Sequence, residues 1–422
     1  MSIQKKIIMN KNNFERLRIV LLTACFLLVV YESFTFHRHW NIYPWDMTYR
    51  YNEILCAHSG VDPFDIFERK ITSEEFCGVR RPDMPVEPLN GRKEVHTYPT
   101  THMAMFWWYG YFSLTTCTII MNIVNLCALV WVLLWGSKHY RRPDRNYLIQ
   151  DILFILCMLL YFVSEICETV NYGLLILGAI LLLHTALQTK HDILAGVVYA
   201  FILIKPQIGV VLFFPLFFGK WYKTIAVAGI ICVVETLFVA WKLDKSPIEL
   251  ILQLPRIGAP YYKGVFCNAA IMLIGPIGQY LVMSCFLLIA AVGCFLVRNA
   301  KDIWVRFLPA LVIIPFWTYS TTPDWLVLLP CFIYIINNKQ KYPRGYVICL
   351  ILGILWCPAF FALRRYGMIP WAKNKLDNVL LFTILTICYM QVILDNRELW
   401  CCRSYFHDLM FWRKRQIVDR SR

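Results

Sequence analysis

Residues 192–219, DILAGVVYAFILIKPQIGVVLFFPLFFG, decide the fold. After Asp192 this run is apolar, and only Lys205-Pro206-Gln207 interrupts it at its middle. A helix needs about 20 apolar residues to cross the hydrocarbon core of a bilayer, and neither half of the run is that long. Pro206 removes a backbone N–H and breaks the helical hydrogen-bond ladder. We therefore predict two short helices, 192–204 and 206–218, around a break that protein or a water-filled cavity must surround.

The whole chain has the composition of a polytopic membrane protein. Of its 422 residues, 59% are hydrophobic and 16% are charged, and the mean hydropathy is +0.53. Soluble domains carry about 25% charged residues, so this chain has too little charge to cover a soluble body. The same figures exclude a disordered chain, collagen, a coiled coil and a disulfide-stapled scaffold. We predict one all-α membrane domain over 1–422, with about twelve spans at 18–36, 114–136, 150–164, 171–187, 192–204, 206–218, 224–241, 279–297, 303–317, 324–336, 346–363 and 377–395.

The positive charge of the chain predicts its orientation in the membrane. The net charge is +15, and Lys and Arg are roughly twice as dense in one set of alternating loops as in the other. Because Lys and Arg concentrate in cytoplasmic loops, we expect both termini and the basic tail 396–422 to be cytoplasmic, and loop 37–113 to be external. This explanation requires no nucleic-acid partner, and the same charge favours contact with anionic membrane lipids.

The external loop 37–113 contains two segments that we expect to lie in the plane of the interface. Residues 46–58 are amphipathic at helical spacing, and residues 103–113 are aromatic and lie close to the next span. In the first segment, three apolar positions stand opposite three polar ones: Tyr49, Ile54 and Ala57 opposite Arg50, Asn52 and Glu53.

Two stretches of this loop hold candidate chemical groups. Asp46, in Tyr43-Pro44-Trp45-Asp46, is a carboxylate crowded by aromatic residues at the membrane boundary, where desolvation makes a better base. The alternative is that Asp46 is the N-cap of the helix that follows. His96 and Tyr98 precede the aromatic segment, either as binding groups or as a turn that leads into it.

Three further polar groups interrupt the later apolar runs. Glu168 and Asn171 share a helix face at the outer start of a span, either as functional groups or as residues of the headgroup region. Lys205 needs an anionic partner, which is either a bound anion or a structural carboxylate, Glu165 or Glu168. Asp324, followed by Trp325, binds a ligand or caps the next helix.

These clusters, in this order, resemble the GT-C fold glycosyltransferases that use polyprenyl-phosphate sugars, and most of all glycosyltransferase family 87, a group of bacterial α-mannosyltransferases. The elements that carry the resemblance cover roughly residues 18–340: Asp46 with Tyr49 or Tyr51, Gly60-Val61-Asp62-Pro63-Phe64, Tyr98-Pro99-Thr100, Glu168 to Leu174, Ala195-Gly196 with Lys205-Pro206 and Lys220-Trp221, Asn268-Ala269-Ala270, and Thr322-Pro323-Asp324-Trp325. The chain departs from the family pattern at the first Gly and the Gln of Gly-Gln-x-Asn, the second Pro of Tyr-Pro-Pro and the Ser of Asn-x-Ser.

The resemblance implies an inverting sugar transfer at the external face of the inner (cytoplasmic) membrane. A sugar, mannose in the first instance, would leave a polyprenyl phosphate for a glycolipid or glycan acceptor, with Asp46 as the general base. The resemblance implies no nucleotide and no required cofactor, although a divalent cation shared by Asp46 and the phosphate is compatible with it. The remaining roles are donor phosphate and lipid binding by Lys205, Gln207, His96 and Tyr98, and substrate binding by Glu168, Asn171, Asn268, Asp324 and Trp325.

Two other classes of function stay open. Many spans and broken helices are also typical of a transporter or flippase of lipid-linked saccharides. A polysaccharide polymerase or ligase of the O-antigen type is the third reading. The sequence contains no Walker A loop, GxGxxG, HExxH or pair of CxxC motifs, so it supports neither ATP-driven transport nor Rossmann cofactor chemistry.

Overall fold

The computed structural model describes residues 45–65, 98–139, 170–253, 277–318 and 322–338, together with the single residues 20, 23, 27, 273 and 275. Over these residues the chain is mostly helical and contains no strand, which confirms the all-α prediction for this part of the chain. The spans expected at 150–164, 346–363 and 377–395 lie outside the described residues, as does nearly all of 18–36. The number of twelve spans therefore stays a prediction.

The other eight predicted spans all correspond to helices. The described elements are α2 (Trp45–His58), α5 (Thr100–Met105), the 3₁₀ helix η3 (Trp107–Tyr111), α6 (Leu114–His139), α8 (Gly173–Gln188), α9 (Asp192–Ile202), α10 (Pro206–Phe218), α11 (Tyr222–Leu243), α14 (Ile277–Leu296), α15 (Ile303–Trp317), the 3₁₀ helix η4 (Thr322–Leu328) and α16 (Leu329–Asn337). The span predicted at 324–336 is α-helical only from Leu329. Pro330 has no N–H to donate to the carbonyl of Leu326, so the preceding turn cannot continue the α-helical ladder.

Three described helices are long and apolar enough to cross a membrane, which indicates a membrane protein. They are residues 114–132 of α6, the 22 residues of α11 and the 20 residues of α14. Their outward faces expose large apolar side chains, such as Ile119, Val234 and Leu288. A helix in lipid satisfies its own backbone hydrogen bonds and can therefore present such a face to the hydrocarbon.

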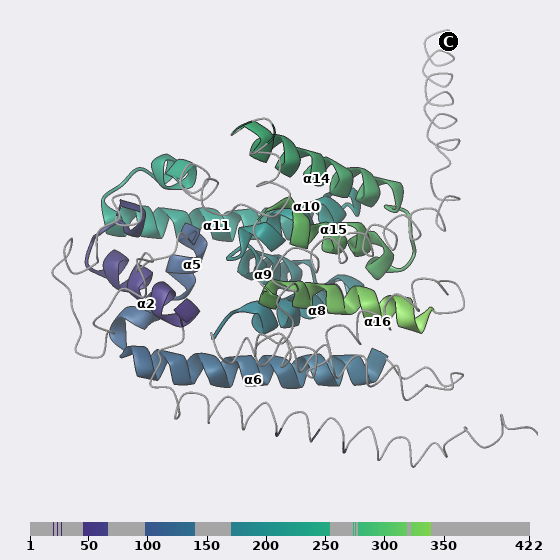
Figure 1. Cartoon of the computed structure of the whole chain (residues 1–422), viewed down its shortest axis with the longest axis horizontal. Helices are drawn as coiled ribbons and strands as arrows, with labels where there is room; N and C mark the ends of the chain where they lie inside the picture. Colours follow the sequence, from purple (N-terminus) through teal and green to yellow (C-terminus); the bar gives the residue numbers. More distant parts are fainter. Residues whose placement is uncertain are drawn as a thin grey trace, which may run out of the picture.

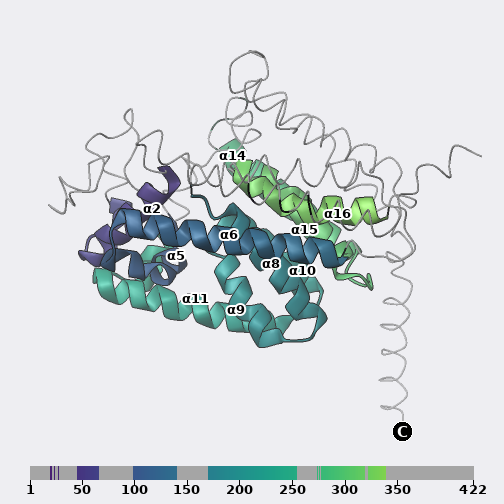
Figure 2. The same cartoon turned by 90° about the horizontal axis from the view of Figure 1, so that it is seen from below.

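Two of the shorter helices, α8 and α15, are mostly buried among the other helices (Figures 1 and 2). In α15 every residue from Trp304 to Trp317 is buried except Arg306, and α15 contacts α8, α10, α14 and α16. It contains Pro309 and Pro315, each of which removes one backbone hydrogen bond. Neighbouring helices can compensate for such breaks where protein surrounds the helix.

Helix α2 lies with α5 at one end of the bundle, beside the beginning of α6 (Figure 1). The helix predicted at 46–58 is confirmed, but its polar side does not face water. Arg50 and Glu53 are fully buried, as is Ile54 on the apolar side. The reason is that α5, η3, α6 and α11 all contact α2. A polar stripe on a helix therefore marks an internal polar site here.

The end of α2 is fixed in place by a glycine turn and an ion pair. Gly60 has a φ of +77°, and the N–H of Val61 donates to the carbonyl of Cys56 (3.0 Å), as in a Schellman helix end. Asp62 comes directly after this turn. Its carboxylate lies 2.5 Å from the ammonium of Lys245, a residue that follows α11. This contact anchors α2 against the C-terminal end of α11.

Candidate functional site

Lys205 occupies the break between α9 and α10, as the sequence predicts. It is the N-cap residue of α10, and Pro206 at the first helical position needs no N–H partner. The Lys205 side chain is 1% exposed. Its Nζ donates to Asn171 Oδ1 (2.8 Å) and forms an ion pair with the carboxylate of Asp324 in η4. The two groups that the sequence left open, a lysine without a known partner and a carboxylate of uncertain role, are thus partners of each other.

Asn171 connects this ion pair to α2. Its Oδ1 accepts from Lys205 and from the backbone N–H of Gly173 (2.9 Å), and its Nδ2 donates to the Asp46 carboxylate. The Lys205 and Gly173 donors require an oxygen at one end of the Asn171 side-chain amide, and the Asp46 carboxylate requires the NH₂ group at the other end. An aspartate at this position would face the Asp46 carboxylate with a like charge.

The backbone before Asn171 is strained. Val170 has a φ of +54°, a left-handed conformation that is rare for a β-branched residue. Its carbonyl accepts a hydrogen bond from the Arg50 guanidinium (3.2 Å), and the carbonyl of Asn171 accepts from Asn125 of α6 (3.2 Å). Strain of this kind clusters at functional sites and persists only where the surroundings hold it in place.

Arg50 lies one helical turn after Asp46, and its guanidinium is 3.5 Å from the Asp46 carboxylate. The guanidinium also lies 3.8 Å from the centroid of the Tyr172 ring and donates to the Tyr98 hydroxyl (2.9 Å). Burial by itself lowers the pKa of Arg50, but Tyr98, Asp46 and Tyr172 together raise that pKa above its ordinary value. Arg50 therefore stays a cation, although it is completely buried.

A second row of buried groups lies behind Arg50. The Glu53 carboxylate accepts from the backbone N–H of Tyr98 (2.9 Å) and lies 3.6 Å from His102 Nδ1. His102 Nε2 is 3.2 Å from the Tyr172 hydroxyl, which in turn is 2.9 Å from the Tyr109 hydroxyl. Burial raises the pKa of Glu53 well above its usual value, against the lowering effects of the Tyr98 N–H and Arg50. Burial likewise raises the pKa of Tyr109, so this phenol keeps its proton.

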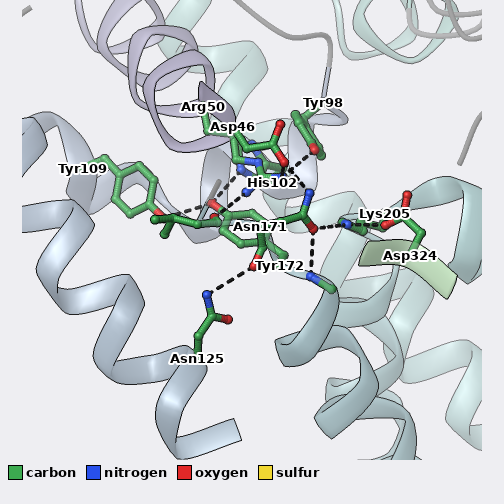
Figure 3. A network of polar contacts seen from close by, with 12 residues as sticks. Asp46, Arg50, Tyr98, His102, Tyr109, Asn125, Asn171, Tyr172, Lys205 and Asp324 are labelled. Carbon is green, nitrogen blue, oxygen red and sulfur yellow. Dashed lines mark hydrogen bonds and ion pairs between the residues drawn. The ribbon is translucent and has the colours of Figure 1, made fainter. Parts of the chain in front are cut away.

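Asp46 and Tyr98 lie at the same edge of the polar network (Figure 3), and both are partly exposed. The Asp46 side chain is 23% exposed, and Tyr98 is half-buried. Behind them, the side chains of Arg50, Lys205 and Asp324 are at most 2% exposed. An external molecule can therefore reach a carboxylate that is oriented from behind by an amide and a guanidinium. Such an oriented carboxylate can accept a proton from a bound hydroxyl.

The structure brings together five residues that the sequence predicted: Asp46, Tyr98, Asn171, Lys205 and Asp324. Asp46 is the second residue of α2 and Asp324 the third of η4, and both carboxylates bond to other segments, to Asn171 and to Lys205. The backbone carbonyl of Gln207 accepts from the Trp317 indole of α15 (2.6 Å), and neither residue of this contact is one of these five. Trp325 belongs to η4, but its side chain lies outside the described part, as do His96, Glu168 and Asn268.

Sequence reasoning missed the groups that surround these five. The amphipathic pattern places Arg50 on a polar helix face, although its spacing of four from Asp46 signals an ion pair. Tyr109 lies in the aromatic segment 103–113 and Tyr172 in the stretch Glu168 to Leu174, but no spacing rule connects them to each other or to His102. Among the described residues, no group of three or more His, Cys, Asp or Glu side chains could hold a metal ion. The divalent cation that the resemblance allows stays a prediction.

No family model, curated protein or solved structure matches this chain. The network itself is therefore the basis for the functional proposal.

Proposed function

We propose that this protein is an integral membrane glycosyltransferase of the GT-C type, built on about twelve spans. It moves a sugar, mannose in the first instance, from a polyprenyl-phosphate donor to a lipid-linked or glycan acceptor. The reaction takes place at the extracytoplasmic face of the cytoplasmic membrane and inverts the anomeric centre.

One observation carries this proposal. Asp46, Asn171, Lys205 and Asp324 come from four separate segments of the sequence and meet in one hydrogen-bonded network. Ionisable groups inside a helical membrane protein are costly, so a network of them supports a functional role. Of these four residues, Asp46 is the most exposed, with 23% of its side chain accessible.

In the proposed reaction, Asp46 accepts the proton of the acceptor hydroxyl. The hydroxyl oxygen attacks the anomeric carbon and forms the new glycosidic bond, while the bond from that carbon to the phosphate oxygen breaks. The leaving polyprenyl phosphate takes the bonding electron pair. Asn171 and Arg50 hold the Asp46 carboxylate in place from behind. General-base assistance of this kind is typically worth about 10²–10⁴-fold in rate.

The leaving phosphate needs a positive charge in a partly apolar cavity. Lys205 remains our first choice for this role, with Arg50 as the other buried cation of the network. Nζ of Lys205 is already bonded to Asp324 and Asn171, so it reaches a phosphate only by exchanging one of these partners. The buried pair with Asp324 would hold the charge ready for this exchange.

A transporter or flippase of lipid-linked saccharides is the second candidate. The observation that favours it is the buried Lys205–Asp324 pair at a helix break, because transporters also place ionisable groups at broken helices. A polymerase or ligase of the O-antigen type has no observation of its own in its favour.

The test is an assay of the purified protein with radiolabelled polyprenyl-phosphate sugars and a panel of glycolipid acceptors. The proposal expects the label in a new glycosidic bond, formed in detergent without a sealed membrane. Movement of intact donor across proteoliposomes, without any transfer in detergent, would contradict it and favour the transporter.

A further inference from the structure

A cavity of about 500 Å³ lies at the far end of α8 from Asn171. From Asn171 to His184, the first residue of α8 in the lining, the helix rises about 20 Å, roughly two thirds of the thickness of a hydrocarbon core. The loops around it are among those that we expect to be cytoplasmic, and they contribute Lys190, Trp221 and Lys301 to the lining.

The lining of the cavity combines aromatic rings with two exposed lysines. Trp304 is buried and stacks on His184 with 4.1 Å between ring centroids, and Trp135 meets the edge of Trp304 at 5.6 Å. Lys190 and Lys301 are exposed, and neither forms an ion pair with another described residue. The one carboxylate of the described lining, Asp302, accepts from the backbone N–H of Trp304 (2.9 Å).

Lys190 also has an unfavourable backbone conformation. It follows α8 with a φ of +61°, and the N–H of His191 donates to the carbonyl of Ala186 (2.9 Å), as in a Schellman helix end. This position normally holds glycine, because a Cβ is strained there. Replacing Lys190 by glycine should therefore relieve this strain while removing the charge.

We propose that this cavity binds the phosphate of an anionic phospholipid. Lys190 and Lys301 face the phosphate, and the three tryptophans contact the glycerol and upper acyl region, where Trp is enriched in membrane proteins. Basic pockets between helices on the cytoplasmic side of a membrane recognise such headgroups. This proposal does not depend on the sugar transfer.

The chain offers a closely matched control for the test. Lys220 ends α10 in the same way: its φ is +64°, and the N–H of Trp221 donates to the carbonyl of Leu216 (3.0 Å). Lys220 lies at the same end of the bundle but is not among the lining residues. Lys190→Gly and Lys220→Gly thus remove the same charge and relieve the same strain, and glycine suits both positions.

Binding is measured by native mass spectrometry of the full-length protein with phosphatidylglycerol and with phosphatidylcholine. We expect phosphatidylglycerol to bind more tightly, Lys190→Gly to weaken its binding about fivefold, and Lys190→Gly/Lys301→Gln to weaken it about 25-fold, since each lysine near an anionic surface contributes comparably. Lys220→Gly should bind as the wild type does. Equal losses in Lys190→Gly and Lys220→Gly, or no preference for phosphatidylglycerol, would overturn the proposal. Displacement of the lipid by millimolar inorganic phosphate would show a site for free phosphate instead.

Discussion

Replacing Lys205 by methionine leaves the Asp324 carboxylate buried without its ammonium partner. Both side chains are at most 2% exposed, so water cannot replace the lost partner without opening the structure. Removing one member of a buried ion pair typically costs about 3–5 kcal/mol. Lys205→Met should therefore lower the stability of the protein by about this amount. Asp324→Val should lower it by a similar amount, because it leaves the Lys205 ammonium buried without its carboxylate.

The double variant Lys205→Met/Asp324→Val distinguishes an ion pair from two independent effects. Replacing both charges by apolar groups of similar volume is often neutral or stabilising, so the double variant should regain most of the stability that either single variant loses. It should still transfer sugar at least about tenfold more slowly, because Asn171 has lost a charged hydrogen-bond donor.

The assay is unfolding of the purified proteins in one detergent, with Lys223→Met as the control. Lys223 is exposed, so its replacement should change stability by less than about 0.5 kcal/mol. If the losses of the two single variants simply add in the double variant, Lys205 and Asp324 are not energetically coupled. The contact between Lys205 and Asp324 would then not be the ion pair that stabilises the network.

Three further predictions concern the residues around Asp46. Asn171→Asp exchanges the amide donor for a like charge facing Asp46, so transfer should fall about 10²-fold, with normal expression, while Asn171→Gln should retain more activity than Asn171→Asp. Arg50→Lys keeps the charge but loses the planar group that stacks on Tyr172 and bonds to Tyr98. The free energy of unfolding should therefore fall by about 2 kcal/mol. An unchanged free energy of unfolding would show that only the charge matters. Burial raises the pKa of Glu53 above its unfolded value, so its protonated form stabilises the fold at low pH, and this contribution is lost as the pH rises through the folded pKa. Glu53→Gln should lose less stability than the wild type between about pH 5 and pH 8, and parallel unfolding curves would contradict this.

The helices could be predicted from the sequence because the bilayer imposes a simple rule. Apolar runs of sufficient length become helices, and Pro206 marks the break at Lys205 in both the sequence and the structure. The break also predicted that Lys205 needs an anionic partner, because an unpaired charge at that depth is costly. The sequence could not show which carboxylate it meets. Asp324 is 119 residues away and reaches Lys205 only because η4 packs against α8.

The burial of α2 could not be predicted, for a different reason. A polar stripe on an amphipathic helix has the same spacing whether it faces water or an internal polar site. The pattern therefore predicts an exposed polar face for Arg50 and Glu53, although both are fully buried in the structure. The partners that make this burial tolerable, Tyr98, Tyr172 and His102, come from other segments. Their approach depends on tertiary packing, which no local pattern encodes.

The most direct test of the proposed function is sugar transfer by Asp46→Asn. Asparagine is nearly isosteric with aspartate, and its Oδ1 can still accept a hydrogen bond from Asn171, so the variant should insert and fold normally. It cannot accept the proton of the acceptor hydroxyl. Under conditions in which chemistry limits the rate, we predict that Asp46→Asn still binds the polyprenyl-phosphate donor but transfers sugar at least about 10²-fold more slowly than the wild type. An Asp46→Asn protein with more than about a tenth of wild-type transfer activity would contradict the assignment of Asp46 as the base.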